Sequence, residues 1–322
     1  MKILVLGGDG FIGSHFVDKA ISLRHEVTVF DRFHNDVSMN LEHHREKIKC
    51  IAGEFANRQQ LQKGLQGQDI VYHFICATDP ISSWDDPFIE IEENLKYSVQ
   101  LFELAAACGV KKIVFPSSGG TIYGPQSDFI TERTLPTPFS PYGITKLATE
   151  HFLHYFHERT GIATDIYRIG NAYGSRQPMD RPQGVIAVWM GKILREANIE
   201  IYGSRDTLRD YIYVEDIVHL LTHSLRDLSS SNTYNLGTGK GVSAFDLLEI
   251  YHKVIDMPFT YKVLPRRKSD NTSVILDSSK LISFFPGFEF QDMEEKIKHT
   301  WLYVKKDYYS MKSKDNLIFT RK

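Results

Sequence analysis

The sequence has little cysteine, little net charge and no long apolar run. Its three cysteines, Cys50, Cys76 and Cys108, lie far apart in apolar stretches and form no Cys-x-x-Cys pair. We therefore expect buried free thiols, and neither a disulfide framework nor a cysteine-based zinc site. The longest apolar runs are too short to span a membrane. A net charge of −2, with acids and bases mixed along the chain, predicts neither a nucleic-acid nor a membrane partner.

The N-terminus also lacks the pattern of a secretory signal peptide. Met1 and Lys2 lead straight into a strand-like run and a glycine turn. Together with the unpaired cysteines, this predicts a cytoplasmic protein. A length of 322 residues is enough for one large domain or two modest ones with an ample core.

The first 31 residues carry the strongest pattern in the chain. Lys2–Leu6 is strand-like, residues 14–23 have apolar side chains at helical spacing, and Glu26–Phe30 is a second strand-like run followed by Asp31. Between the first strand and the helix stand the glycines Gly7, Gly8, Gly10 and Gly13. This order is typical of the βαβ unit that binds a dinucleotide.

Each part of this unit has a physical role at a pyrophosphate. Glycine permits a tight turn, lets phosphate approach the backbone and lets the helix pack close to the strand. The helix N-terminus offers free N–H groups and the positive end of its dipole. Asp31 can accept both hydroxyls of an adenosine ribose and would repel a 2′-phosphate, which predicts NAD, although Arg32 beside it points toward NADP. The alternative is an ordinary tight turn; a Walker A loop is excluded, because no Lys-Ser/Thr pair follows the glycines.

After Asp31, strand-like and helix-like segments alternate. The expected strands are 48–52, 70–75, 112–116 and 163–169, and the expected helices between them are 61–65, 89–108 and 142–159. This alternation predicts an α/β fold with a Rossmann-like, doubly wound parallel sheet. Beyond it we expect an exposed loop at 171–181, helices at 184–197, 216–227 and 243–255, and strands at 199–202 and 259–264.

This pattern predicts two domains. Residues 1–170 would bind the dinucleotide, with later segments returning to that domain, and residues 171–310 would form mainly a smaller, discontinuous second domain. The chain from Lys305 onward is polar and basic, so we expect it to be poorly ordered, with 311–322 as a tail.

The strongest catalytic candidates are Tyr142 and Lys146, because a helix beginning at Tyr142 places both on one face. A free tyrosine titrates near pH ~10 and is a poor base at neutral pH, but a nearby ammonium favours its phenolate. Such a pair can act as a general base for a hydroxyl proton, and the lysine can also hold a nicotinamide ribose. Tyr-x-x-x-Lys is common, and the alternative is an exposed helix pair. Pro141 and the dinucleotide unit upstream favour the catalytic interpretation.

A second candidate is the loop Phe115-Pro-Ser-Ser-Gly-Gly-Thr-Ile-Tyr-Gly124. It follows an expected strand, so it lies at the carboxyl edge of the sheet, where ligands bind in such folds. Its hydroxyl residues, Ser117, Ser118 and Thr121, can pass a proton between a substrate and Tyr142. The alternative is a polar turn.

These motifs resemble those of the extended short-chain dehydrogenase/reductases. Within them the chain is most similar to the nucleotide-sugar epimerase/dehydratase group, especially UDP-glucose 4-epimerase-like proteins, up to about residue 300. Besides the glycine loop, the Ser-Ser…Tyr-Gly loop and Tyr142-x-x-x-Lys146, the matching segments are Gly53-Glu54-Phe55, Asn94, Arg168-Ile-Gly-Asn171, Arg209-Asp-Tyr-Ile-Tyr-Val and Arg267-Lys-Ser-Asp270.

The resemblance implies two sets of ligand contacts. NAD would contact Gly7, Gly10, Phe11, Ile12, Gly13, Asp31, Glu54, Phe55, Ser117, Tyr142 and Lys146. A nucleotide-diphosphate sugar would contact Ser118, Asn171, Tyr202, Arg209, Arg267 and Asp270. The two arginines suit a diphosphate, because a guanidinium binds phosphate oxygens in pairs.

The chain departs from the family pattern in the serine loop. Gly119 stands at the usual catalytic Ser/Thr position, so the hydroxyl role would pass to Ser118 or Thr121. Gly119 and Gly120 also stand where sugar 4,6-dehydratases carry an Asp-Glu pair, which argues against a dehydratase. Val274 stands where the family limits substituents at the sugar's second carbon, and its small side chain would admit an N-acetylated sugar.

The resemblance therefore implies an NAD-dependent enzyme that inverts C4 of a UDP-glucose/galactose-type sugar, with N-acetylated and uronic sugars left open. Tyr142, helped by Lys146, would take the 4-hydroxyl proton directly or through Ser118 or Thr121. The C4 hydride would pass to NAD, and the 4-keto sugar would turn over and take it back on its other face. The family also implies a homodimer formed by helices 89–108 and 142–159, and a place in polysaccharide precursor supply.

Other functions stay open. A nucleotide-sugar 4-ketoreductase or dehydrogenase would share these motifs but need exchangeable NAD(P)H. A non-catalytic NAD-binding module is also compatible with such a fold, and it would not need Tyr142. We predict no metal site. The histidines His151, His154 and His157 drift around their helix at three-residue spacing, and no carboxylate or cysteine set completes a site.

Overall fold

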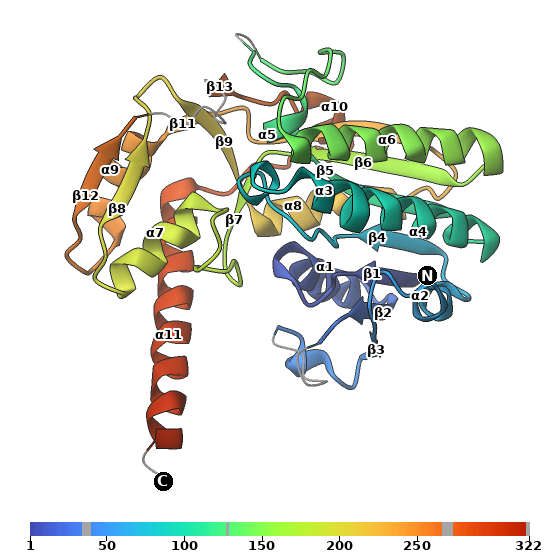
Figure 1. Ribbon diagram of the computed structural model, residues 1–322, viewed down its shortest axis with the longest axis horizontal. Coiled ribbons are helices and arrows are strands. Elements are labelled where there is room, and N and C mark those ends of the chain that lie inside the picture. The colour runs from blue at the N-terminus through green and yellow to red at the C-terminus, as the bar shows by residue number, and fades with distance from the viewer. Residues whose placement is uncertain (34–39, 127–128, 266–272, 320–322) are drawn as a thin grey trace.

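A parallel sheet forms the centre of the protein (Figure 1). The computed structural model describes residues 1–33, 40–126, 129–265 and 273–319. Within these ranges the sheet has seven strands in the order β10-β6-β5-β4-β1-β2-β3. Their bounds are β1 Lys2–Leu6, β2 Glu26–Asp31, β3 Ile48–Ala52, β4 Ile70–His73, β5 Lys112–Ser118, β6 Ala163–Ile169 and β10 Asn232–Leu236. The predicted Rossmann-like α/β fold is confirmed.

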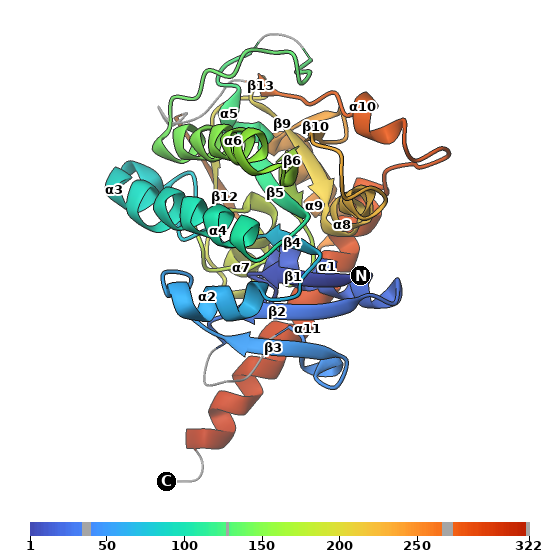
Figure 2. The same ribbon diagram turned by 90° about the vertical axis from the view of Figure 1, so that its right-hand side faces the viewer.

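Helices cover both faces of this sheet (Figure 2). One face carries α1 (Phe11–Ser22) and α8 (Val214–Leu221), and the other carries α2 (Arg58–Leu65), α4 (Lys96–Ala107) and α6 (Pro141–Thr160). Strand β1 shows why its sequence is a continuous apolar run. Ile3 and Val5 pack into the core on the α1 side, whereas Leu4 and Leu6 pack into the core on the α4 side. A strand buried on both faces cannot alternate apolar and polar residues.

Helix α6 has clear start and stop signals. Ser140 caps it by accepting a hydrogen bond from the backbone N–H of Gly143 at 3.1 Å, and Pro141 occupies its first turn. Gly161 ends it in the left-handed region, at φ 74°. These signals fix Tyr142 at the beginning of the helix, as predicted.

Short helical segments connect the longer elements. They are α3 (Pro87–Ile89), a π-helix (Glu90–Leu95) that leads into α4, α5 (Gly119–Ile122), and the 3-10 helices Glu42–His44, Ser82–Trp84 and Thr222–Leu225. The predicted helix 89–108 is therefore continuous in space but begins with a π-helical segment, a geometry that is frequent at functional sites.

Two smaller sheets and a set of helices form the second part of the molecule. The strands are β7 (Asn171–Tyr173), β8 (Ile199–Tyr202), β9 (Leu208–Tyr213), β11 (Gly241–Ser243), β12 (Tyr261–Leu264) and β13 (Ser273–Val274). The helices are α7 (Val185–Leu194), α9 (Ala244–Val254), α10 (Ser279–Ile282) and α11 (Met293–Phe319). Their core includes Trp189, Tyr251 and Trp301, each at most 2% exposed. Helix α11 packs on this core and runs away from the rest of the protein (Figure 1).

Three predictions about local structure were wrong. Residues 171–181 are not simply an exposed loop, because Asn171–Tyr173 form β7 and Tyr173 is buried beside β9. The chain after Lys305 is not irregular, because α11 continues to Phe319. Ile297, Trp301 and Val304, which precede Lys305, form a buried apolar stripe on one face of this helix. The sequence signal for α11 was this stripe, hidden among charged residues.

The third error concerns the cysteines. All three thiols are free, but Cys50 is exposed and Cys76 and Cys108 are only partly buried. Cys50 lies on β3, an edge strand of the sheet, where one flank and part of one face meet solvent.

Candidate active site

A cavity of about 730 Å³ follows the carboxyl ends of the central strands and reaches α7, β8 and β9. It begins where β1 and β4 lie side by side, the point at which the strand order reverses and ligands bind in open parallel sheets. The predicted site residues that line it are Gly7, Gly10, Phe11, Ile12, Gly13, Asp31, Glu54, Phe55, Ser117, Ser118, Thr121, Tyr142, Lys146, Asn171, Tyr202 and Arg209. Arg267 and Asp270 lie outside the described residues.

The glycine loop leaves no room for side chains. A Cβ on Gly13 would lie 2.2 Å from the carbonyl oxygen of Gly7. Gly7 itself has φ +74°, and its Cβ would lie 3.0 Å from the backbone nitrogen of Ile75. Gly10 directly precedes α1, so the N–H groups of the first helical turn face the cavity. This cradle fits the pyrophosphate of a dinucleotide.

Asp31 ends β2 on the same edge. Its carboxylate accepts hydrogen bonds from the backbone N–H groups of Asp9 at 3.0 Å and Arg32 at 2.8 Å. Burial raises the pKa of Asp31 above its ordinary value, while these two donors oppose the shift. The contacts fix the carboxylate where an adenosine ribose would follow the pyrophosphate.

Tyr142 and Lys146 lie one turn apart on α6, as predicted, and both line the cavity. The Lys146 Nζ lies 5.5 Å from the centre of the Tyr142 ring and 4.7 Å from that of Phe115, and it donates to the carbonyl oxygen of Pro116 at 3.3 Å. The ammonium is therefore held between the phenol and the sheet edge.

The surroundings of Tyr142 in the protein disfavour its phenolate. Burial raises its pKa well above the ordinary value, and Cys76 and the carboxylate of Glu90 raise it further. Forming the phenolate at neutral pH therefore requires compensating positive charge. Lys146 supplies one such charge, and an oxidised nicotinamide, if bound beside Tyr142, would supply another.

The serine loop presents unpartnered hydroxyls to the cavity. Within the described residues, the buried Oγ of Ser117 and Oγ1 of Thr121 have no hydrogen-bond partner. A buried polar group without a partner is costly, and at a cavity wall it marks a place where ligand would bind. Ser118 also lines the cavity, as the residue before α5.

The structure explains why position 119 carries no hydroxyl. A Cβ on Gly119 would lie 2.5 Å from Cδ1 of Leu276 and 2.9 Å from the carbonyl oxygen of Arg168. A Cβ on Gly120 would meet nothing closer than the Ser118 Oγ, at 4.0 Å. Position 119 therefore has no space for the side chain that the family pattern leads one to expect.

The far end of the cavity is polar and comes from the second part of the molecule. Asn171 donates to the carbonyl oxygen of Asp210 at 3.2 Å, which holds its amide at the start of β7. Arg209, on β9, donates to the carbonyl oxygen of Leu208 at 3.0 Å. Asn171 and Arg209 thus line the cavity from two neighbouring strands, β7 and β9, which pair in parallel.

Comparison with known proteins identifies the fold family. A model of the NAD dependent epimerase/dehydratase family matches residues 3–237. The chain belongs to this family. NAD, predicted from the glycine loop and Asp31, is the cofactor on which the family depends.

The relatives of this chain include enzymes with different activities. A UDP-glucose 4-epimerase of Halalkalibacterium halodurans is 30% identical, and the match covers 98% of this chain and 99% of that protein. A dTDP-4-dehydro-6-deoxyglucose reductase of Escherichia coli is also 30% identical, covering 77% and 79%. The structure of a UDP-glucose 4-epimerase of Thermotoga maritima with UDP-glucose superposes with a TM-score of 0.86 at 32% identity, covering 96% of this chain and 100% of that one.

Sequence reasoning missed two features of this family member's cavity. The first is an ion pair at Tyr202: Lys192 Nζ lies 2.9 Å from the Glu200 carboxylate, which also accepts from the Tyr202 hydroxyl at 3.3 Å. The sequence feature that could have indicated this ion pair is Lys192, the single lysine in the otherwise apolar helix α7.

The second is a buried polar network behind Tyr142. Glu90 is 1% exposed and accepts hydrogen bonds from Thr78 and, at 3.1 Å, from Asn94. Asn94 also accepts from the backbone N–H of Ala77 at 2.8 Å. The network ties the loop after β4 to the π-helix, and only Asn94 was predicted. None of the helices in the described part of the chain is both long and apolar enough to cross a membrane.

Proposed function

We propose that this protein is an NAD-dependent 4-epimerase acting on a nucleotide-diphosphate hexose of the UDP-glucose/galactose type. The observation that carries the proposal is the single cavity shared by the glycine cradle, the Tyr142/Lys146 pair and the polar end around Asn171 and Arg209. A cofactor, a base and a nucleotide-binding region meet there. UDP-glucose 4-epimerases are among the proteins that are about 30% identical to this chain.

In this proposal the chain's own residues move the proton and hold the ligands. NAD, when bound, would supply the acceptor for the C4 hydride and the source from which the 4-keto sugar regains it on its other face. Tyr142 takes the 4-hydroxyl proton, and the Lys146 ammonium stabilises the resulting phenolate. Arg209 holds the diphosphate and Asp31 the adenosine ribose. Because the hydride is returned, no external reductant is consumed.

Thr121 is the better candidate for the relay hydroxyl. Its Oγ1 is buried, lines the cavity and has no partner within the described residues, whereas a hydroxyl at position 119 has no room. Ser118 is the alternative. Replacing each in turn, by Thr121→Val and Ser118→Ala, should lower turnover mainly in the first variant.

The decisive experiment adds no cofactor. Purified protein is incubated separately with UDP-glucose, UDP-N-acetylglucosamine and UDP-glucuronate, and the configuration at C4 is followed by proton NMR. Interconversion of any of the three supports the proposal. Tyr142→Phe should lower the rate by about 10²–10⁴, while Tyr155→Phe, on the exposed face of the same helix, should leave it unchanged. Absence of interconversion even with added NAD would reject the proposal for these sugars.

A 4-ketoreductase is the second candidate. The reductase among the relatives is as similar in identity as the epimerase, and the missing side chain at Gly119 changes the proton relay at C4. A reductase would oxidise added NADH or NADPH in the presence of a nucleotide 4-keto sugar, with one cofactor consumed per product. An epimerase turns over without this consumption.

We further propose a homodimer formed by α6 together with α4 and the π-helix Glu90–Leu95 that leads into it. These helices lie side by side and carry exposed apolar side chains, Ile91, Ile144, Phe152 and Tyr155. An exposed apolar patch of this kind is typical of an interface. The double substitution Ile144→Glu with Phe152→Glu should convert the dimer to a monomer in sedimentation velocity. A wild type that sediments as a monomer would contradict the proposal.

We also propose that the two parts of the molecule bind different ligands. Residues 1–170, joined by β10 from the later chain, would hold NAD, and residues 171–310 would mainly hold the nucleotide sugar. The glycine cradle and Asp31 in the first part, and Arg209 in the second, support it. Three free thiols favour a cytoplasmic location.

A further inference from the structure

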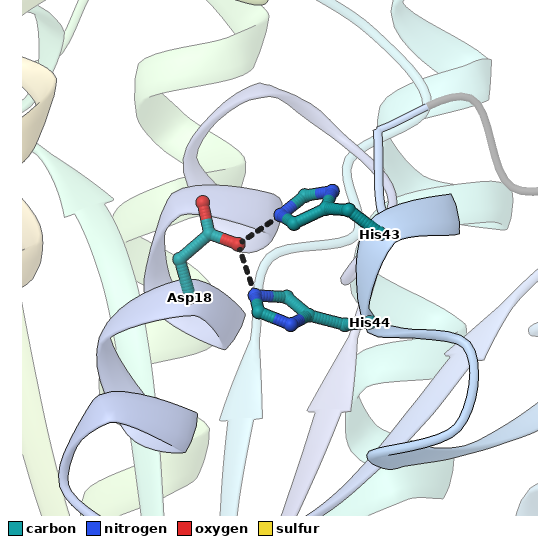
Figure 3. Close-up of side chains that lie close together, drawn as sticks. All are labelled: Asp18, His43 and His44. Carbon is teal, nitrogen blue, oxygen red and sulfur yellow. Dashed lines mark hydrogen bonds and ion pairs between the residues drawn. The ribbon is translucent and has the colours of Figure 1, made fainter.

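Contrary to our expectation from the sequence that the chain has no metal site, we propose that Asp18, His43 and His44 form a zinc site outside the sugar cavity. Asp18 lies on α1, and the two histidines lie in the 3-10 helix Glu42–His44 (Figure 3). The Nε2 atoms of His43 and His44 lie 3.1 Å and 3.0 Å from the same carboxylate oxygen, Oδ1 of Asp18. One ligand atom from each residue lies within 4.8 Å of the other two. Two imidazoles and a carboxylate converging in this way are a donor set suited to Zn²⁺.

Two of the three separations between ligand atoms match a tetrahedral ion. Zinc bonds to imidazole nitrogen and carboxylate oxygen of about 2.0–2.1 Å place neighbouring ligand atoms of a tetrahedron about 3.3 Å apart. The two nitrogen–oxygen distances are within a few tenths of an ångström of that value. The side chains are between 14% and 52% exposed, so water can complete the coordination. Magnesium is a poor fit, because it prefers oxygen ligands in an octahedron.

The second oxygen of Asp18 has a separate partner. Arg176 Nη1 lies 2.8 Å from Asp18 Oδ2, not from the oxygen that the histidines approach. A guanidinium on the outer oxygen orients the carboxylate and leaves Oδ1 directed at the two imidazoles, which is how outer partners hold ligating carboxylates. The ion pair and the zinc ligand set can therefore coexist on one carboxylate.

Zinc here would join two segments that border the cofactor cradle. Asn40, just before the histidines, donates from its backbone to Asp9 Oδ1 at 2.9 Å and from its amide to the Asp9 carbonyl at 2.7 Å. Asp9 belongs to the glycine loop, and α1 begins directly after that loop. Fixing the Glu42–His44 helix to α1 would brace this side of the loop. The proposal is independent of the sugar chemistry.

The test is a zinc titration of tag-free protein stripped with a chelator. Competition against a chromophoric zinc chelator should show one Zn²⁺ per chain in the wild type, and Mg²⁺ should not compete. His44→Ala and Asp18→Asn should each weaken binding by about tenfold or more. Glu42→Gln is the matched control: it lies in the same short helix, pairs with Arg45 and belongs to no ligand set. It should bind as the wild type does.

A second readout keeps the test independent of folding defects in the variants. Zinc should slow amide hydrogen exchange at Arg45 and Lys47, whose N–H groups bond back into the Glu42–His44 segment. A wild type that binds zinc no more tightly than His44→Ala, or whose exchange at these amides is unchanged by zinc, would overturn the proposal. In that case the imidazoles serve only as hydrogen-bond donors to Asp18.

Discussion

Adding a single methyl group at Gly119 should be costly, whereas the same change one residue later should not. The new Cβ would lie 2.5 Å from Leu276 Cδ1 and 2.9 Å from the Arg168 carbonyl oxygen, where ordinary contacts begin near 3.4 Å. Leu276 is fully buried, and a strand carbonyl cannot move aside alone. Overpacking of this kind costs about 1–3 kcal/mol. At Gly120 the nearest atom is 4.0 Å away, so Gly120→Ala has no such cost.

The pair of variants isolates this steric effect. Both replace glycine by alanine inside the same helix, α5, so the propensity gain of about 1 kcal/mol is common to both and cancels in the comparison. Urea unfolding should show Gly119→Ala less stable than Gly120→Ala by about 1–3 kcal/mol. For a chain of this length the difference corresponds to a midpoint lower by about 1.5–4.5 °C in a thermal melt. Equal stabilities would refute the claim that position 119 is closed to a side chain.

Two other predictions concern buried charge. The first is that His73 makes the fold less stable in mild acid: burial, and next the ammonium of Lys146, lower its pKa to about 3, so the unfolded chain takes up this proton below pH ~6.5 while the folded chain does not. The free energy of unfolding should therefore fall by about 2 kcal/mol between pH 7 and pH 5 on account of this residue. Urea unfolding of His73→Gln at both pH values should show a loss smaller than that of the wild type by this amount, and an equal loss in both proteins would contradict the shift. The second is that Glu150→Ala costs about 3–5 kcal/mol, because it strands the buried guanidinium of Arg168, whose Nη2 lies 2.6 Å from the carboxylate. The matched control is Glu158→Ala on the exposed part of the same helix, and comparable losses in both variants would argue that the buried ion pair contributes nothing specific.

The sequence predicts the strands of the central sheet other than β10 closely, because their signals are local. Strand β6 has the predicted bounds, and α6 differs by one residue at each end. Each is an apolar or amphipathic run between Gly, Pro or Ser residues, so the period and the end signals lie within a few residues of each other. The same holds for the Tyr142/Lys146 spacing, which depends only on one helix.

What the sequence does not predict depends on contacts between distant segments. β10, with the sequence Asn-Thr-Tyr-Asn-Leu, has no apolar run; it is a strand because β6 offers it a partner edge. Glu150 and Arg168 are ordinary surface residue types until α6 and β6 bury them together. The Asp18 and His43/His44 cluster joins residues 25 apart that meet only because β2 runs back past α1. No local pattern carries this information.

The place of β10 in the sheet also sets an order of events while the chain is being made. β6 is buried along its whole length, and its outer edge is completed by Asn232↔Asp165 and the four pairs that follow. Those partners leave the ribosome more than sixty residues after β6, once β7, α7, β8 and β9 of the second part have been synthesised. During that interval β6 exposes an apolar strand edge that any other chain can pair with. A polypeptide stopped before Asn232 would hold every glycine of the N-terminal loop and still leave the outer edge of β6 unpaired.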